Sequence, residues 1–450
     1  MGCSKMKKTT RILNNAIKSV AKNKENFVLN PYKDFTRERI FGFEKTITFV
    51  IGLNKDSLKN NIADLQKDEL KLGTESAFIQ SRDKILPSAF HQILKNTISQ
   101  IILKNEYDGL KLLAIDGSSF QIPINTGDTD SYIKSTYSSD GNLIKGHNEL
   151  HLNAIYDLNA GYFEDIIIQK IHKTNEQKAF CDLVDDRKEK PYSTLLIADR
   201  GYASWNNLAH VVQKQQYFLI RIKDGYGGIK RGLNLPSEDE YDCFFEINLC
   251  RGQTNEDKKR YEDKNHYKFL PVGVRFDFLP KKRQKNKPSQ QYKINFRVVR
   301  FKIGDGSYES VLTNLPQAKY SITTIKYLYN KRWGIETAYR SLKYTVGLSH
   351  LHCKSITGIL QEIYAKVIIY NLAQSLISEI VVSKKSNNKY LYKPNFSVAI
   401  HQEILLLRGE TKLKLVIRTI SKDLIPIRPN RSFKRNKQVR RFKGFHYRAG

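Results

Sequence analysis

Apolar residues recur at intervals of three and four in the first part of the chain, which predicts helices. Residues 34–66 show this spacing with a break at Gly52-Leu53-Asn54, so we expect two helices there. Another helix is expected after Pro87, in SAFHQILKNTISQIIL. Residues 1–35 are basic and weakly patterned, and we expect a loose arm. Residues 1–105 are therefore interpreted as a small helical N-terminal domain.

After residue 105 the pattern changes to short apolar runs that alternate with helical stretches. The segment 193–204 carries four apolar residues directly before Asp199, which predicts a strand buried on both faces. Asn159-Ala160-Gly161 predicts a hairpin turn between two strands. The other strands are expected at 111–123, 151–158, 162–171 and 217–223, and helices at 175–187 and 205–216. This alternation predicts a mixed α/β sheet over 106–223.

Residues 224–308 interrupt this rhythm. Short strands are expected at 241–249, 268–279 and 292–303, with charged loops such as 281–291 between them. We interpret this segment as a β-rich insertion that does not continue the α/β layer.

The sheet is expected to resume at 309–316, followed by one long helix from about Ser321 to Tyr344 and another from about Ile356 to Val382. Residues 309–375 would complete the α/β core. Residues 376–450 would form a C-terminal helical region with a basic tail.

The charge balance points to a polyanionic partner. The chain has 76 Lys and Arg against 45 Asp and Glu, a formal net charge of +31. Nucleic acid fits such a surplus better than a membrane surface, because no basic amphipathic helix with a clear apolar face is evident. No apolar run reaches the length of about 18 residues that a membrane span needs. The first residues lack the apolar core of a secretory signal, so we expect a cytoplasmic, nucleoid-associated bacterial protein.

The five cysteines are expected to be reduced thiols, mostly buried. Their number is odd and no C-x-x-C pair occurs. Cys243 and Cys250 with His266 match no common zinc-site spacing.

Two of the expected strands deliver an aspartate at their carboxyl ends. LLAIDGS contains Asp116, and LLIADRGY contains Asp199. Ligand chemistry gathers at the carboxyl ends of strands in open α/β sheets, and two neighbouring carboxylates repel unless a cation lies between them. Oxygen ligands of this kind select Mg²⁺ or Mn²⁺. The alternative is that both are turn or helix-capping residues, since Asp before Gly or Ser is common there.

The expected long helix carries a second set of chemical groups. In YNKRWGIETAYRSLK, the residues Tyr329, Arg332, Glu336 and Lys343 fall within a sector of roughly 60° on a regular helix. An apolar stripe beside them would pack against the core and leave this row facing a cleft. The alternative is a solvated face of ion pairs at four-residue spacing.

Together these motifs resemble the IS4 group of DDE insertion-sequence transposases. The match consists of ID at 115–116, ADRGY at 198–202 and the ungapped pattern Y-x2-R-x3-E-x6-K, with SAFIQSRDKI at 76–85 before the core. The resemblance implies a ribonuclease H-like core and two-metal phosphoryl transfer on DNA, with Mg²⁺ that Mn²⁺ can replace. Asp116 would bind both ions, while Asp199 and Glu336 would each complete one.

The resemblance also implies DNA contacts and a dimer on paired transposon ends. Arg332 and Lys343 would bind phosphates, Tyr329 would contact the transposon end, and Arg200 would form either a phosphate contact or a structural ion pair. Further contacts are expected from the basic, aromatic tail 428–450, including Arg435, Arg440 and Arg441. The N-terminal helical domain is expected to read the ends.

One departure from the family concerns the hairpin step, which usually uses an aromatic residue of the insertion, often tryptophan, to hold a flipped base. Here the tryptophans, Trp205 and Trp333, lie outside the insertion, so a Phe, Tyr or His of the insertion, such as His266 or Phe276, would substitute by stacking, and the hairpin step stays open. Two other functions stay open: a catalytically silent DNA-binding protein derived from a transposase, and a protein that coats nucleic acid.

Overall fold

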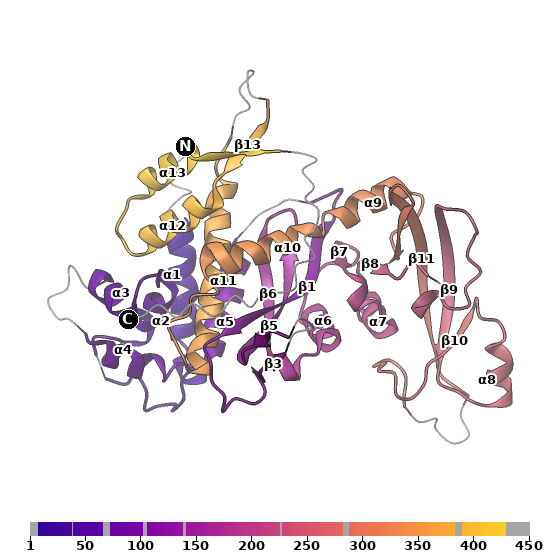
Figure 1. Cartoon of the computed structure of the whole chain (residues 1–450), viewed down its shortest axis with the longest axis horizontal. Coiled ribbons are helices and arrows are strands. Elements are labelled where there is room, and N and C mark those ends of the chain that lie inside the picture. The colour runs from indigo at the N-terminus through magenta and orange to yellow at the C-terminus, as the bar shows by residue number, and fades with distance from the viewer. Residues whose placement is uncertain are drawn as a thin grey trace.

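The computed structural model describes residues 8–37, 39–65, 73–101, 106–137, 141–225, 227–281, 288–382 and 389–428. A helical part contains elements from both ends of the chain, and a sheet extends from the middle of the molecule to its far side (Figure 1). Across these ranges, no helix combines the length and apolar character needed to cross a membrane. The basic tail, with Arg435, Arg440 and Arg441, lies outside the described residues.

The N-terminal helices confirm most of the sequence pattern. The expected pair and the helix after Pro87 are present, and Gly52 ends the first of the pair. The loose arm was wrong for Lys8–Ala21, a helix whose apolar side, including Ile12 and Ile17, is buried. The helix Glu75–Arg82 was also not predicted, because it has too few apolar residues to show a helical period. The helices are α1 (Lys8–Ala21), α2 (Phe43–Ile51), α3 (Leu58–Leu65), α4 (Glu75–Arg82) and α5 (Pro87–Gln100).

The C-terminal helices pack against the N-terminal ones. The central helix α11 (Ile356–Ser378) is buried on most of its surface and contacts α2, α5 and α12. The buried Arg82 of α4 binds Glu362 of α11 at 3.0 Å and Gln361 at 2.7 Å. Both ends of the chain therefore share one core. The remaining elements here are α12 (Phe396–Leu407), α13 (Leu413–Lys422) and the hairpin β13 (Leu391–Pro394) with β14 (Leu424–Ile427).

The central strands form a mixed sheet in the order β6-β5-β1-β7-β8. Neighbours β6, β5 and β1 are antiparallel, whereas β7 and β8 run parallel to β1. Strand β7 is buried on both faces, as expected, because its alternate side chains join two different cores. The bounds are β1 (Lys111–Ile122), β5 (His147–Asp157), β6 (Tyr162–Lys170), β7 (Thr194–Ala198) and β8 (Tyr217–Ile222), with the short strands β2 (Tyr132–Ile133), β3 (Thr136–Tyr137) and β4 (Leu143–Ile144).

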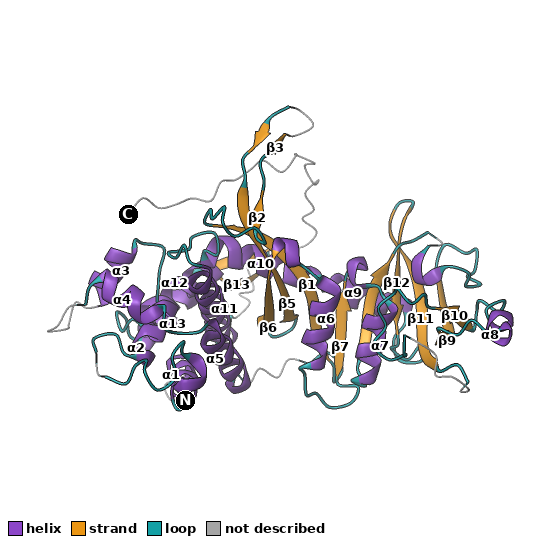
Figure 2. Ribbon diagram, turned by 90° about the horizontal axis from the view of Figure 1, so that it is seen from below, coloured by secondary structure: helices purple, strands orange, loops and turns teal. Residues whose placement is uncertain are grey.

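Helices cover both faces of this sheet. On one face, α6 (Glu176–Asp185) and α7 (Trp205–Gln213) pack against β1, β7 and β8. On the other face, α9 (Ile322–Asn330) packs against β7, β8 and the strands beyond them, and α10 (Trp333–Arg340) packs near β1. Figure 2 shows α6 and α7 beside the strands of the sheet.

The expectation that the β-rich segment does not continue the α/β layer was wrong. Strand β12 pairs with β8, β11 pairs with β12, and β9 and β10 extend the same sheet. The reason is that β12 satisfies the open edge of β8 and offers its own second edge to β11. The expected strand 268–279 is limited to three residues, since Pro271 and Gly273 follow in a turn. The elements are β9 (Tyr241–Cys250), α8 (Asn255–Arg260), β10 (Tyr267–Phe269), β11 (Gln291–Gly304) and β12 (Ser307–Thr313).

The expected single helix 321–344 is instead three pieces. Between α9 and α10 the backbone hydrogen bonds span three residues, from Arg332 N–H to Tyr329 O and from Ile335 N–H to Arg332 O. After α10 the helix widens into a π turn, Ser341–Val346, which ends at Gly347 with φ 92°. Such local tightening and widening leaves no signal in apolar spacing, but it shifts which side chains share a face.

Candidate active site

Strands β1 and β7 bring the two aspartates to the same end of the sheet. The strands are parallel neighbours with Ile115 opposite Ala198, and Asp116 and Asp199 are the next residues of each. Asp116 accepts the backbone N–H of Gly117 at 2.9 Å. Asp199 caps a short 3-10 turn by accepting the N–H of Gly201 at 2.8 Å. The capping alternative is therefore realised for Asp199, but it coexists with a position beside Asp116.

Helix α10 brings Glu336 to the same place. Arg332 donates from Nη2 to Glu336 Oε1 at 2.9 Å, and its Nη1 lies 4.0 Å from Asp116 Oδ2. Tyr339, on the next turn, places its hydroxyl 2.7 Å from the carbonyl oxygen of Asp116. Helix α10 is thus anchored on the strand that carries Asp116. The structure therefore brings Asp116, Asp199 and Glu336 close enough for their charges to interact.

The electrostatics of this group favour a bound cation. Burial raises the pKa of Asp116 to about 6, and the neighbouring charges of Asp199 and Glu336 add to the effect. The Gly117 N–H and Arg332 oppose it without cancelling it. Three carboxylates with this one guanidinium among them form a set of hard oxygen ligands, which fits Mg²⁺ or Mn²⁺.

The other members of the helical motif occupy different environments. Tyr329 is only 3% exposed, its ring lies under Arg332 at 5.8 Å, and burial raises its pKa to about 12. Lys343 donates to Ser118 Oγ and Ser119 O, both at 2.7 Å, so it fastens the π turn to β1. Arg200 is exposed and makes no ion pair with a described residue, which leaves its guanidinium available.

A comparison with known families identifies the family of the chain. The family model of the transposase DDE domain matches residues 108–372, more than half of the chain, and this range contains Asp116, Asp199 and Glu336. The chain belongs to the DDE transposase family. It is a DNA transposase.

Two further comparisons add less to this assignment. Among solved structures, this transposase is similar to the piggyBac transposase synaptic complex with hairpin DNA, at 11% sequence identity and a TM-score of 0.42. That similarity covers 96% of this chain and 87% of the other. No curated protein matches the sequence.

The transposase site contains residues that sequence reasoning did not identify. On the side of β1 opposite to Ser118, His151 of β5 lies 3.0 Å from Glu176 of α6 and 2.9 Å from Ser119 Oγ. The contact with His151 lowers the pKa of Glu176. A Cβ on Gly117 would lie 2.3 Å from His151 Nε2, so the residue after Asp116 must be glycine for this pair to fit. The Asp-Gly step was the only signal, and it equally suggested a turn.

A second cluster in the transposase has the composition of a metal site. Cys181, His210 and Asp277 place their ligand atoms within 4.8 Å of one another, a closeness that Asp116, Asp199 and Glu336 do not reach. However, both ring nitrogens of His210 already face carboxylates, Asp185 at 2.9 Å and Asp277 at 3.0 Å. Burial disfavours the charged imidazole, but hydrogen bonds to Cys181 and these carboxylates outweigh it and raise the pKa of His210 to about 9. A proton, not a metal ion, suits this cluster.

The expectation of reduced thiols agrees with the described residues, whereas the expectation that most are buried holds for only half of them. Cys181, Cys243, Cys250 and Cys353 are free thiols, and two of them are buried. His266, once considered with Cys243 and Cys250, binds Asp263 at 2.8 Å.

Proposed function

We propose that this DDE transposase cleaves DNA at the ends of its element and joins the freed end to target DNA. The phosphodiester bonds would react at a site formed by Asp116, Asp199 and Glu336. The observation that carries the proposal is the convergence of these carboxylates from β1, β7 and α10, with the pKa of Asp116 raised to about 6. Three neighbouring carboxylates repel one another, and bound divalent cations would stabilise them.

The metal ligands would be the three carboxylates, with Mg²⁺ as the natural ion and Mn²⁺ as its substitute. Two such ions, when bound, would activate the attacking oxygen and stabilise the leaving oxygen. Asp116 interacts electrostatically with both other acids, which suits a shared ligand. Arg332 is only 7% exposed and is held beside Asp116 and Glu336, so it would orient these acids more than it would bind DNA. The exposed Arg200 can bind a phosphate.

Tyr329 and Lys343 fit positioning roles in this site. The buried ring of Tyr329 supports the guanidinium of Arg332, and Lys343 ties the helix to the strand of Asp116. In this arrangement neither side chain is available to contact DNA directly. Their role in the motif would be to hold Asp116 and Glu336 in position.

The strand order supports a ribonuclease H-like core. Three antiparallel strands, β6-β5-β1, are followed by two strands parallel to β1. Separately, the Y-x2-R-x3-E-x6-K motif on α9 and α10 supports membership of the IS4 group. The proposed core would comprise 106–223 and 309–375, with 224–308 inserted. The helices of 1–105 would read the ends, and a homodimer would pair them in a bacterial nucleoid.

The two residues first considered for a hairpin step differ in exposure: the side chain of His266 is 62% exposed and pairs with Asp263, whereas Phe276 is buried. Phe276 is 4% exposed and packs in the core, so it cannot stack on a base. Trp205 packs against Phe296 of β11. Trp333 is 53% exposed and lies beside Arg332, at 5.2 Å, next to the acids. We therefore assign base stacking to Trp333 if a base is flipped.

The function is tested with a plasmid that carries the gene between its native flanks. Wild-type protein with Mg²⁺ should nick or excise this DNA, and Glu336→Gln should do neither. Glu256→Gln, an exposed acid on α8, is the matched control and should retain activity. Cleavage that survives Glu336→Gln would contradict the active-site assignment. Binding of the flanks without any cleavage in Mg²⁺ or Mn²⁺ would instead establish a catalytically silent DNA-binding protein.

A further inference from the structure

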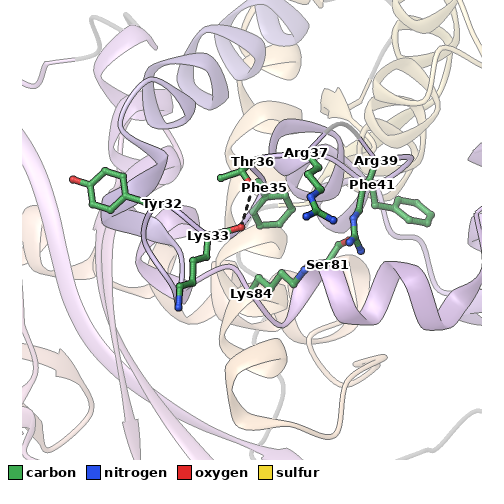
Figure 3. A pocket seen from close by; sticks show the side chains of 9 residues that line it. All are labelled: Tyr32, Lys33, Phe35, Thr36, Arg37, Arg39, Phe41, Ser81 and Lys84. Carbon is green, nitrogen blue, oxygen red and sulfur yellow. Dashed lines mark hydrogen bonds between the residues drawn. The ribbon is translucent and has the colours of Figure 1, made fainter.

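A basic pocket lies in the N-terminal helical part, apart from the carboxylates. It has a volume of about 340 Å³ and is formed by the loop before α2 and the end of α4 (Figure 3). Figure 3 shows the side chains of Arg37, Arg39 and Lys84 directed toward the region around Ser81. The lining residues are Tyr32, Lys33, Phe35, Thr36, Arg37, Arg39, Phe41, Ser81 and Lys84.

The cations of this pocket make no ion pair with a described residue. This holds for Lys33, Arg37, Arg39 and Lys84, although Lys84 lies 6.0 Å from the Phe35 ring. Asp34, within the same loop, is 8% exposed and accepts hydrogen bonds from Asn30. Glu38 lies outside the described residues. Four cations that line one pocket without forming ion pairs repel one another, a cost that a bound polyanion removes.

The loop that presents these cations is held in an unusual conformation. Tyr32 and Phe35 have φ of 63° and 57°, in the left-handed region that side chains other than glycine rarely adopt. Lys24 Nζ donates to Phe35 O at 3.1 Å, and Thr36 Oγ1 donates to Lys33 O at 3.1 Å. Strain of this kind persists where a surrounding structure enforces it, often at ligand clamps.

We propose that this pocket binds the phosphate backbone of duplex DNA, and the proposal rests on the transposase function. A single phosphodiester carries one negative charge, so four cations match a strand that presents several phosphates in succession better than a small anion. Arg37 and Arg39 can each grip a phosphate with two N–H groups, and the Ser81 hydroxyl can donate beside them. Tyr32, 83% exposed at the rim, offers a further hydroxyl to the backbone.

The test measures binding of a fluorescent 30-base-pair duplex by anisotropy at several salt concentrations, in the Glu336→Gln background so that the DNA stays intact. Arg37→Ala/Arg39→Ala should weaken binding at least tenfold and lower the slope of log affinity against log salt by about 1 to 2, since each phosphate contact contributes about 0.9. Lys18→Ala/Lys22→Ala removes the same charge from two exposed positions, one in α1 and one directly after it, and should change affinity less than threefold. Arg37→Lys/Arg39→Lys should retain most of the salt slope.

The outcomes separate the pocket from the wider function. Equal effects of the two alanine pairs, with the fold intact by circular dichroism, would overturn the pocket proposal while leaving DNA binding in place. A parent protein that binds no duplex at low salt would overturn the transposase function itself. A loss confined to the arginine pair, with normal thermal unfolding, supports the pocket as a phosphate site.

Discussion

The raised pKa of Asp116 makes metal binding sensitive to mild acid. The perturbation is a change from pH 7.5 to pH 5.0. With a pKa of about 6 in the metal-free protein, Asp116 is ~3% protonated at the higher pH and ~90% protonated at the lower. A metal ion must displace that proton, so the apparent affinity for Mn²⁺ should fall ~10-fold, or ~1.4 kcal/mol. An ordinary aspartate, with a pKa of about 3.9, would lose less than ~10% of its affinity over the same interval.

Isothermal titration calorimetry with MnCl₂ at constant ionic strength measures this affinity directly. Repeating the titration near pH 6 in two buffers of different ionisation enthalpy gives the protons released, which should be about one half per protein. Asp116→Asn should bind Mn²⁺ weakly and without this pH dependence. An affinity within twofold at the two pH values would refute the reasoning, because Asp116 would then either not be a ligand or not be perturbed by its neighbours.

Three further predictions concern the scaffold around the site. Gly117→Ala places a Cβ 2.3 Å from His151 Nε2 and should destabilise the protein by about 1–3 kcal/mol in urea unfolding, whereas adding His151→Ala should recover part of the loss. Arg82→Met removes the guanidinium beside the buried Glu362, which keeps His352 at 3.3 Å as a partner, and should cost about 3–5 kcal/mol; an unchanged urea midpoint would show that the pair is not needed. For His210 the folded pKa, about 9, exceeds its usual 6.5, so its stabilising effect is complete below about pH 6.5 and is lost as pH rises through 9. The melting temperature should therefore drop between pH 7 and 9.5 more in wild type than in His210→Gln, and parallel curves would contradict this.

The meeting of the acids at one end of the sheet was predictable because strand ends carry a strong local signal. Four apolar residues before Asp199 predicted a doubly buried strand, and the structure shows alternate residues of β7 in two cores. Parallel pairing then brings Asp199 beside Asp116. Glu336 was found through its spacing from Tyr329 and Arg332, which the tightened turn between α9 and α10 preserves well enough for Arg332 to reach it.

Other features depend on long-range contacts that no sequence pattern encodes. The burial of Tyr329 follows from packing of α9 on the far strands, so a residue expected at the DNA lies in a core. The pair of His151 and Glu176 joins residues from different elements behind Gly117. Continuity of the sheet through β12 depends on an edge-to-edge pairing between segments about 90 residues apart, which hydrophobic spacing alone cannot report.

Location of bound Mn²⁺ by anomalous diffraction from crystals of the wild-type protein tests the central claim most directly. Our account predicts two anomalous peaks contacted by Asp116, Asp199 and Glu336, with Asp116 contacting both, and loss of at least one peak in Glu336→Gln. No manganese at these carboxylates under saturating conditions, or manganese bound instead by Cys181, His210 and Asp277, would contradict it.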